Sequence, residues 1–395
     1  MQVYLDNAST TKMSKTAINA MIPYFDEVYG NPSSLHSVGQ RAKEVLEEAR
    51  ATVAQCLGAN ANEIYFTSGG SEADNQAIVS ASRIGARKGK KHIITTAFEH
   101  HAVLHTLKKL EQEGFEVEYL PVGKEGNITA EQVAAAIKED TCLVTTMTAN
   151  NEIGSVLPIA EIGKVCREKK VLFHTDAVQA VGHIPVNVTE MNVDMLSLSG
   201  HKFHGPKGVG VLYAKKGVAL VNLIEGGAQE RGKRAGTENI AGIVGLAAAL
   251  KEATDDLDAN MKKVSALRDK LIRGLSGIPH SVLNGDKHSR LPSNVHFCFE
   301  GIEGESLLLF LDEYGIQASS GSACTSGSLD PSHVLLAIGH PHEIAHGSLR
   351  LTLSEYTTEE EIDHAIEAVP KVVDRLRNMS PIWRDKVSGK KPFIL

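Results

Sequence analysis

The chain has little that would tie it to a membrane or to nucleic acid. Its 395 residues contain no apolar run long enough to span a bilayer. The formal net charge is −7, so a general nucleic-acid-binding surface is not indicated. The first residues, MQVYLDNAST, have no basic region and no long apolar stretch, and we therefore expect no signal peptide.

Cysteine is also scarce, and its spacing is informative. The five cysteines are scattered and include no C-x-x-C pair: Cys56, Cys142, Cys166, Cys298 and Cys324. This pattern argues against a disulfide framework and against a zinc ribbon. It favours a reducing compartment, and we expect the cytoplasm.

What the chain does have is enough apolar sequence for a large core. Hydrophobic residues make up 42% and charged residues 23%. The length suits one large and one smaller domain. We expect the large domain over residues 13–260, the small one over 1–12 and 261–380, and a tail over 381–395. The tail is either a docking segment for a partner protein or, as we favour, disordered beyond about Lys386.

Short apolar runs alternate with segments of helical periodicity in the first half of the chain. The predicted strands are 64–67, 92–96, 117–122, 142–148, 171–175 and 194–199, and the predicted helices are 37–57, 71–88, 103–112, 129–139 and 159–168. Such alternation predicts an α/β domain with a mainly parallel sheet. After Pro279 the pattern changes, and a strand at 294–299 with helices at 304–311 and 358–379 indicates a smaller α+β domain.

Polar side chains follow several of these strands where they end. They are His100, Asn151, Asp176, Gln179, Ser199, His201 and Lys202. Ligands bind beyond the carboxyl ends of the strands in open sheets of this kind. One such residue alone is usually structural, but together they suit a flat aromatic cofactor with a ring nitrogen, a ring oxygen and a phosphate.

Lys202 stands in a tight turn, in the sequence Ser-Gly-His-Lys, directly after a predicted strand. A lysine held there can lose solvating water and proton affinity, as an imine-forming lysine requires. The alternative interpretation is an exposed turn lysine, and this cluster of residues alone supports both interpretations about equally.

A glycine-rich turn joins the strand at 64–67 to the next helix. It reads Ser68-Gly69-Gly70-Ser71, and the backbone N–H groups of such a helix start suit a phosphate. Ser71 would either cap the helix or bind phosphate through its hydroxyl.

Small polar residues surround one of the cysteines. Cys324 lies in SSGSACTSGS, over residues 319–328, where we expect a mobile loop and a thiol that is not buried among apolar side chains. Such a thiol suits a nucleophile. Arg350 begins a predicted strand, and its fork-shaped guanidinium suits a substrate carboxylate.

Many motifs occur in one order along nearly the whole chain. They include LDNASTT, YGNPSSLHS, FTSGGSEADN, NNEIG, HTDAVQAVG, SGHKFHGPKG, GGAQERGKRAGTEN and SSGSACTSG. Together they resemble the cysteine desulfurases of the NifS/IscS type, in the long-loop branch of the class V aminotransferase fold. The resemblance implies a pyridoxal-phosphate-dependent transferase of fold type I. The family's GGGxExG has Ala228 here, and its Ala-Thr is here Gly70-Ser71.

The resemblance also assigns roles to residues. It implies a covalent link between Lys202 and pyridoxal 5′-phosphate. Phosphate contacts are implied for Gly70, Ser71, Ser199 and His201, and a further cofactor contact for Gly200. Ring contacts are implied for Asn151, Asp176 and Gln179, and ring stacking for His100. Arg350 and Asn31 would bind the substrate. Thr237 would reach the phosphate of a neighbouring subunit, which implies a homodimer with shared active sites.

The implied activity is desulfuration of L-cysteine to L-alanine. Cys324 would carry the sulfur as a persulfide to an iron–sulfur scaffold protein, and would be a transient ligand of iron–sulfur clusters there. No direct nucleic-acid or membrane partner is implied. Two alternatives stay open: another enzyme of the same fold, such as a selenocysteine lyase or an aminotransferase, and a non-enzymatic docking subunit.

Overall fold

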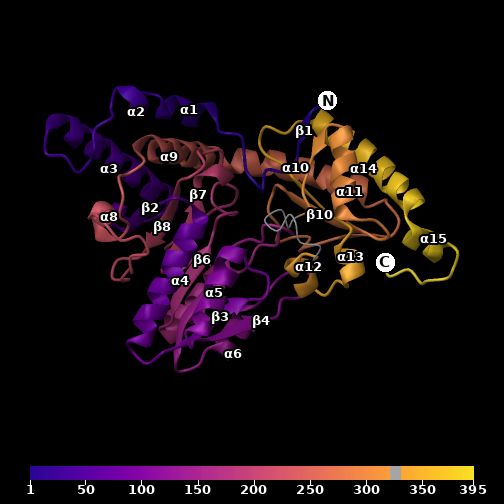
Figure 1. Cartoon of the computed structure of the whole chain (residues 1–395), viewed down its shortest axis with the longest axis horizontal. Coiled ribbons are helices and arrows are strands. Elements are labelled where there is room, and N and C mark those ends of the chain that lie inside the picture. Colours follow the sequence, from indigo (N-terminus) through magenta and orange to yellow (C-terminus); the bar gives the residue numbers. More distant parts are fainter. Residues whose placement is uncertain (321–330) are drawn as a thin grey trace.

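The computed structural model describes residues 1–320 and 331–395, which form two lobes of unequal size (Figure 1). In these residues the larger lobe is built on a seven-stranded sheet of order β2-β8-β7-β6-β5-β3-β4. Its strands are β2 (Ile64–Thr67), β3 (His92–Thr96), β4 (Glu116–Leu120), β5 (Thr141–Met147), β6 (Leu172–Asp176), β7 (Met195–Ser199) and β8 (Gly210–Ala214). Only β8 runs against its neighbours. The predicted α/β class with a mainly parallel sheet is confirmed.

Helices flank this sheet because its central strands are buried along their whole length. They are α1 (Lys15–Met21), α2 (Pro23–Asp26), α3 (Ser37–Leu57), α4 (Gly70–Ala86), α5 (His101–Gln112), α6 (Ala130–Ala136), α7 (Ile159–Lys169), α8 (Gln229–Gly232) and α9 (Ile240–Asp255), with 3₁₀ turns η1 (Ala61–Glu63) and η2 (Gly200–Lys202). The predicted helix over 37–57 agrees with α3, which ends at Gly58 with φ +68°. That left-handed conformation favours glycine.

The smaller lobe contains an antiparallel sheet of order β12-β10-β9. Its elements are β9 (Ser281–Leu283), β10 (Asn294–Phe299), β12 (Ser348–Thr352), α10 (Leu257–Leu275), α11 (Gly304–Glu313), α12 (His333–Ala337), α13 (His342–Ala345) and α14 (Glu359–Met379). The chain's start joins this lobe, because β1 (Val3–Tyr4) pairs in parallel with β11 (Ile316–Gln317). The prediction of an α+β lobe is therefore confirmed, while the exact domain boundaries stay a prediction.

Two local expectations differ from the structure. The sequence from Ile240 to about Leu275 is helix-like and predicts one long helix, but α9 ends at Asp255 and α10 starts at Leu257, with a non-helical Asp256 between them. The N-cap of α4 is Gly69, so Ser71 lies inside the helix and does not cap it.

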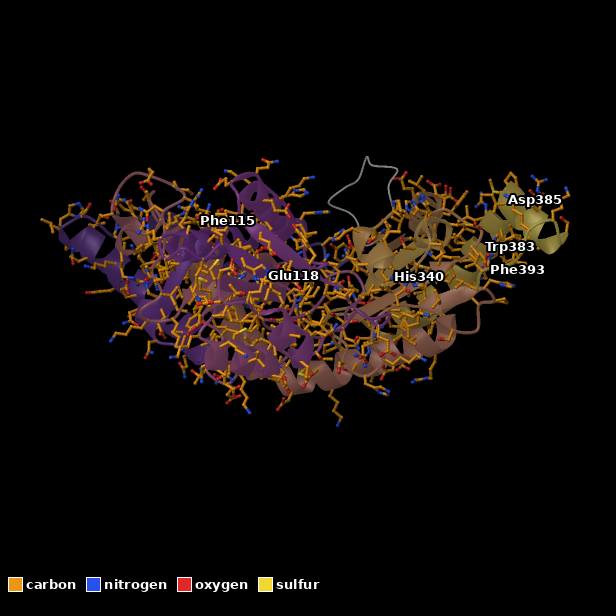
Figure 2. All side chains as sticks on the ribbon, turned by 90° about the horizontal axis from the view of Figure 1, so that it is seen from below. Phe115, Glu118, His340, Trp383, Asp385 and Phe393 are labelled. Carbon is orange, nitrogen blue, oxygen red and sulfur yellow. The ribbon has the colours of Figure 1, made fainter. Side chains whose placement is uncertain are left out.

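The expectation of a disordered tail is wrong. Residues after Ser380 form α15 (Pro381–Val387) and a return segment. Glu300, which is fully buried, accepts hydrogen bonds from Lys386 Nζ at 2.6 Å and from the backbone N–H of Leu395 at 2.9 Å. The rings of Trp383 and Phe393 lie edge to face, 5.3 Å apart (Figure 2). A buried ion pair and an aromatic contact thus hold the tail on the smaller lobe.

Within the described ranges, 1–320 and 331–395, no helix is both long and apolar enough to cross a membrane.

Candidate active site

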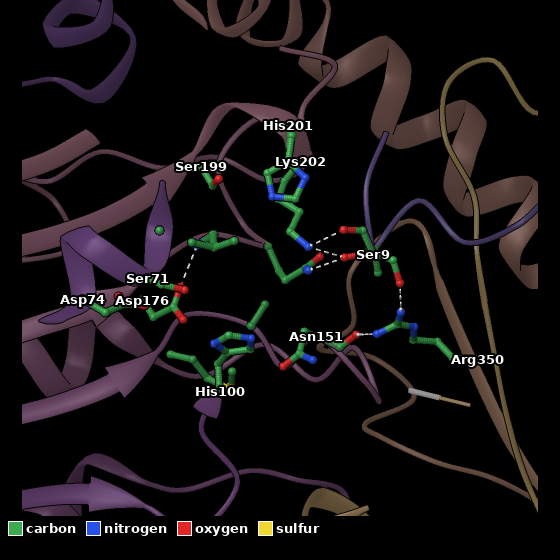
Figure 3. Close-up of a pocket in the computed structure, with 16 residues that line it drawn as sticks. Ser9, Ser71, Asp74, His100, Asn151, Asp176, Ser199, His201, Lys202 and Arg350 are labelled. Atoms are coloured by element: carbon green, nitrogen blue, oxygen red, sulfur yellow. Dashed lines mark hydrogen bonds between the residues drawn. The ribbon is translucent and has the colours of Figure 1, made fainter. Parts of the chain in front are cut away.

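A cavity of about 430 Å³ opens at the carboxyl ends of the central strands, facing the smaller lobe (Figure 3). Its volume lies in the range of small-molecule sites. It is lined by Ala8, Ser9, Gly70, Ser71, Asp74, His100, Met147, Ala149, Asn151, Asp176, Val178, Gln179, Ser199, His201, Lys202 and Arg350. The structure therefore gathers the strand-end residues that the sequence singled out.

Lys202 reaches the cavity because η2 turns the chain sharply after β7. Its Nζ donates hydrogen bonds to the backbone oxygens of Ala8 at 2.5 Å and Ser9 at 3.0 Å (Figure 3). These acceptors belong to the N-terminal segment, which crosses from the smaller lobe. The amine is thus held at the junction of the lobes and is not an exposed turn lysine.

Asp176 ends β6 in the interior of the site, where only 5% of its surface is exposed. Burial raises the pKa of its carboxyl group to about 6, although Oδ1 accepts a hydrogen bond from Val178 N–H and the Lys202 charge favours ionisation. A partner that carries a proton at this point would be held by a strong, charge-assisted hydrogen bond.

His100 is the N-cap of α5, and its Nδ1 accepts a hydrogen bond from Ala102 N–H. Burial, followed by the charge of Lys202, lowers the pKa of His100 to about 4. The imidazole is therefore neutral near pH 7, with its ring at the cavity (Figure 3).

The start of α4 forms one end of the cavity. A Cβ atom at Gly70 would lie 2.6 Å from Val178 Cγ2, so any larger residue there would require the Val178 side chain to shift. Ser199 and His201 lie at the same end, and His201 Nδ1 is 3.1 Å from the hydroxyl of Thr10. This arrangement of backbone N–H groups, hydroxyls and an imidazole suits an anionic group.

Arg350 lies at the opposite end, on β12 of the smaller lobe. Its guanidinium donates to Asn151 O at 2.9 Å, to Asp6 Oδ1 at 3.0 Å and to Ser9 Oγ at 2.8 Å. These contacts fix the orientation of the fork at the cavity wall.

Not every predicted residue lies at this cavity. Asn31 is exposed, and its side-chain oxygen accepts a hydrogen bond from Ser33 N–H. Thr237 is exposed and also lies outside the cavity lining. Gly200 is buried beside the lining, in η2. Cys324 lies outside the described residues.

The chain on either side of residues 321–330 is bonded to the site. Ser319 and Arg350 pair through their backbones, with Ser319 N–H donating to Arg350 O at 3.2 Å. Beyond the gap, Ser332 Oγ donates to buried Glu152 Oε2 at 2.5 Å, and His333 Nε2 lies 2.9 Å from Glu99 O. Ser319 thus bonds to the cavity-lining Arg350, whereas Ser332 and His333 bond to Glu152 and Glu99, the sequence neighbours of the lining residues Asn151 and His100.

Sequence reasoning missed several lining residues. Ala8 and Ser9 belong to the motif LDNASTT, for which the sequence predicts no role in the site. Asp74 lies on α4, in a helical pattern that gives no sign that one carboxyl group faces the cavity.

Among the residues that the structure describes, no cluster of histidine, cysteine, aspartate or glutamate could hold a metal ion. The predicted role of Cys324 as a transient iron–sulfur ligand stays a prediction.

The sequence of the chain matches one family model over most of its length. Residues 3–365 match the aminotransferase class-V family, and the chain belongs to it. Within that family, it is 55% identical over 393 residues to a protein of Clostridium botulinum strain Hall named cysteine desulfurase IscS, with 99% of each chain covered. A protein of the same name from Methanosarcina thermophila is 54% identical over 380 residues, covering 96% of this chain and 94% of that one.

Solved structures agree. A NifS-like protein superposes with a TM-score of 0.89 at 39% identity, covering 95% of this chain and all of the other. A structure described as SspA in complex with cysteine gives a TM-score of 0.79 at 37% identity, covering 90% of this chain and 100% of that one. The resemblance to NifS/IscS-type proteins and the expected fold are confirmed.

Glu99, just before His100, gives a prediction for stability. Burial raises the pKa of Glu99 to about 8, from an ordinary 4.5. The folded state then binds more protons than the unfolded state, so stability falls as pH rises through that window, by at most about 1.4 kcal/mol per pH unit. Glu99→Gln cannot titrate, and we expect it to gain stability relative to wild type from pH 4.5 to about 8. Urea unfolding of both proteins at several pH values measures this difference in the free energy of unfolding.

The matched control is Glu305→Gln, which removes an exposed carboxyl group on α11. Its stability curve should run parallel to that of wild type. A parallel curve for Glu99→Gln as well would show that Glu99 is ionised in the folded protein.

Proposed function

We propose that this protein is a pyridoxal-phosphate-dependent cysteine desulfurase, which converts L-cysteine to L-alanine and leaves the sulfur as a persulfide on Cys324. One observation carries the proposal. Lys202, Asp176 and Arg350 line one cavity, and the segment that carries Cys324 is attached to Arg350 at one of its ends. The names of the relatives support the same activity.

The residues present fit pyridoxal 5′-phosphate. The narrow space at Gly70, where a Cβ would meet Val178, leaves backbone N–H groups of α4 as the wall of a phosphate site. Buried Asp176 offers a carboxylate to a protonated ring nitrogen, Asn151 and Gln179 offer amide donors, and His100 offers a flat ring. Lys202 would hold the cofactor's aldehyde carbon. When bound, the cofactor draws electrons away from the substrate Cα.

Three side chains of the protein would then bind the substrate and transfer its protons. Arg350 would orient the substrate carboxylate through its fork. Lys202 Nζ would take the proton from Cα and return one to the product. His100, neutral near pH 7, can accept the proton of a thiol at its imidazole.

The atoms and electrons of the proposed sulfur transfer balance with cysteine and the enzyme thiol as the only reactants. The Cys324 thiolate attacks the substrate Sγ, an S–S bond forms, and the Cβ–Sγ bond breaks. The electron pair of that bond stays with the carbon fragment, which takes up protons to become alanine. One cysteine and one enzyme thiol thus give one alanine and one enzyme persulfide.

A second copy of the chain would complete the site. Thr237 and Asn31 lie outside the cavity of their own chain. Such positions are expected if Thr237 contacts the cofactor, and Asn31 the substrate, in the site of a neighbouring subunit. Large apolar side chains near Asn31 are strongly exposed, with Phe25 at 68%, Tyr29 at 72% and Leu35 at 94%. Exposed patches of this kind mark protein interfaces. Sedimentation equilibrium should give the mass of a homodimer, and a monomer of full activity would contradict this.

The acceptor of the sulfur would be a scaffold protein for iron–sulfur cluster assembly in the cytoplasm. The name IscS, carried by the relatives, supports that role. Transfer of ³⁵S from labelled cysteine to a purified scaffold protein, through the enzyme, measures it directly.

The activity is tested by incubating the cofactor-loaded protein with L-cysteine and a thiol reductant. We expect alanine and sulfide in equal amounts. With a 2-oxo acid added as amino acceptor, formation of 3-mercaptopyruvate and a transferred amino group would instead indicate an aminotransferase. Activity on selenocysteine alone would indicate a selenocysteine lyase. A protein that takes up no cofactor would be the non-enzymatic docking subunit.

Arg350→Lys should weaken cysteine binding. Lysine keeps the charge but cannot reproduce the two parallel hydrogen bonds of the fork. We expect KM for cysteine to rise by about 10- to 100-fold, the value of one hydrogen bond to a charged group, with a smaller change in kcat. Arg268→Lys is the matched control, because Arg268 also bonds to backbone oxygens in the smaller lobe but lines no part of this cavity. An unchanged KM in Arg350→Lys would remove Arg350 from the substrate site.

A further inference from the structure

A contact between a histidine and a glutamate joins the two lobes near the ends of the segments that carry Lys202 and Arg350. His204 Nε2 lies 3.1 Å from Glu355 Oε2. His204 follows Lys202 directly after η2, in the larger lobe, and Glu355 follows Arg350 directly after β12, in the smaller lobe. This contact therefore connects the turn that presents the amine of the cavity to the strand that presents its guanidinium.

The backbone of His204 also holds the N-terminal segment that crosses between the lobes. Its N–H donates to Thr11 Oγ1 at 2.9 Å, and its carbonyl oxygen accepts from Ser14 N–H at 2.9 Å. Carbonyl groups of the same segment bind Lys202. The φ angle of His204 is +63°, a left-handed conformation that is uncommon outside glycine. The contacts around His204 must therefore hold it there.

The partners of the two ring nitrogens determine where protons lie. Nδ1 is 2.7 Å from Lys12 O, which can only accept, so Nδ1 carries a proton. A neutral ring has no second N–H, and its Nε2 lone pair would then face an oxygen of Glu355. The ordinary pKa is 4.5 for the carboxyl group and 6.5 for the imidazole, so a proton shared between them resides on the imidazole. The geometry thus favours a doubly protonated His204 paired with an ionised Glu355.

The electrostatic surroundings agree with this assignment. The charged and titratable groups around the pair are Glu355 and Tyr356 after β12, Glu252 of α9, Lys263 of α10, His183 after β6, Lys12 and Lys202. Burial lowers the pKa of His204, but the hydrogen bond and the charge of Glu355 outweigh it and raise this pKa above 6.5. Burial likewise raises the pKa of Glu355, but the bond and charge of His204 lower it below 4.5.

These directions define the pH range of the ion pair. It exists above the lowered pKa of Glu355 and below the raised pKa of His204. The contribution of His204 is complete below its ordinary pKa of 6.5 and is lost as pH rises through the higher pKa of the folded protein. The contact between the lobes therefore weakens on the alkaline side.

We propose that His204 and Glu355 are positioning residues, which as an ion pair hold the Lys202 turn and the Arg350 strand at the separation that L-cysteine spans. The substrate would contact both lobes at once, with its carboxylate at Arg350 and its amino end towards Lys202. The KM for cysteine therefore depends on the ion pair. This inference rests on the proposed function, which assigns cysteine to the cavity.

The test compares wild type with Glu355→Gln, as cofactor-loaded enzymes, from about pH 6 to about pH 9. Glutamine can bond to either form of the ring, since its amide both donates and accepts, but it carries no charge. We expect the KM of the variant to exceed that of wild type by about tenfold near pH 6, the value of one hydrogen bond to a charged group. The ratio should fall towards one as His204 loses its proton. Titration of the substrate affects both enzymes equally and cancels in the ratio.

The matched control is Glu359→Gln, which breaks the ion pair between Glu359 and Lys270 at 2.7 Å. Both partners of that pair lie in the smaller lobe, on α14 and α10. Its KM should equal that of wild type at every pH. For Glu355→Gln, a ratio that does not change with pH would overturn the positioning role, because the charge of His204 would then have no effect on substrate binding.

Nitrogen-15 NMR of the histidine rings gives a measurement that does not depend on activity. Near neutral pH, both ring nitrogens of His204 should carry a proton in wild type, and His204→Asn should remove these signals. Glu355→Gln should leave a single N–H, on Nδ1. A single N–H in wild type would overturn the proposal, and this measurement requires no variant to fold. If both N–H groups are found but no desulfurase activity, the proposed function is refuted and the ion pair stands. The ratio of dissociation constants for L-cysteine would then replace the ratio of KM values.

Discussion

Lys202→Ala is expected to abolish turnover and to remove the visible absorbance of a covalently bound cofactor. The side chain has two roles in the proposed reaction, since it would hold the cofactor and would move the Cα proton. Loss of a positioned acid–base group alone costs about 10²- to 10⁴-fold in rate. We therefore expect kcat/KM for cysteine to fall by at least about 10³-fold, with the loss concentrated in kcat.

The control for this experiment is Lys215→Ala, which removes a lysine that pairs with Asp194 after β8, away from the cavity. It should keep both the absorbance and the rate. A chemical check is also available: small primary amines should restore part of the activity of Lys202→Ala, because they can take the place of the missing amine. Residual activity within tenfold of wild type, without added amine, would assign the proton transfer to another group.

The sequence predicted the elements whose boundaries have local causes. The bounds of α3 follow from its apolar spacing and from Gly58, and β2, β3 and β10 match runs bounded by polar or glycine residues. The site followed from the same logic, because parallel strands end at one edge and bring their last residues together.

What could not be predicted depends on contacts between distant segments. The tail is ordered because Glu300, far away in sequence, accepts hydrogen bonds from Lys386 and Leu395. The amine of Lys202 is held by carbonyl groups of Ala8 and Ser9, almost two hundred residues earlier. In the sequence, Asp74 is one polar residue of an amphipathic helix. It becomes a buried neighbour of Asp176 only because α4 packs over β6 and β7.

The largest effect on sulfur transfer is expected for Cys324→Ala. The variant should still load the cofactor and respond spectrally to cysteine, because Lys202, Asp176 and Arg350 are unchanged. Alanine and persulfide formation should fall by at least about 10³-fold, since no other group replaces the attacking thiolate. Mass spectrometry of the protein after one turnover should find one added sulfur in wild type and none in the variant.

Among the described cysteines, Cys56 offers the matched control. It is half-buried in α3, and burial raises the pKa of its thiol, so it holds little thiolate near neutral pH. Cys142, Cys166 and Cys298 are buried, and burial raises the pKa of their thiols to about 11, 12 and 12. Cys56→Ala should therefore keep the rate and the added sulfur. If Cys324→Ala keeps full activity on cysteine, the sulfur leaves by a route without an enzyme persulfide. Because the burial of the four described thiols argues against each of them as the carrier, that result would point to attack of the added thiol reductant on the substrate Sγ, which gives alanine and a persulfide of the reductant.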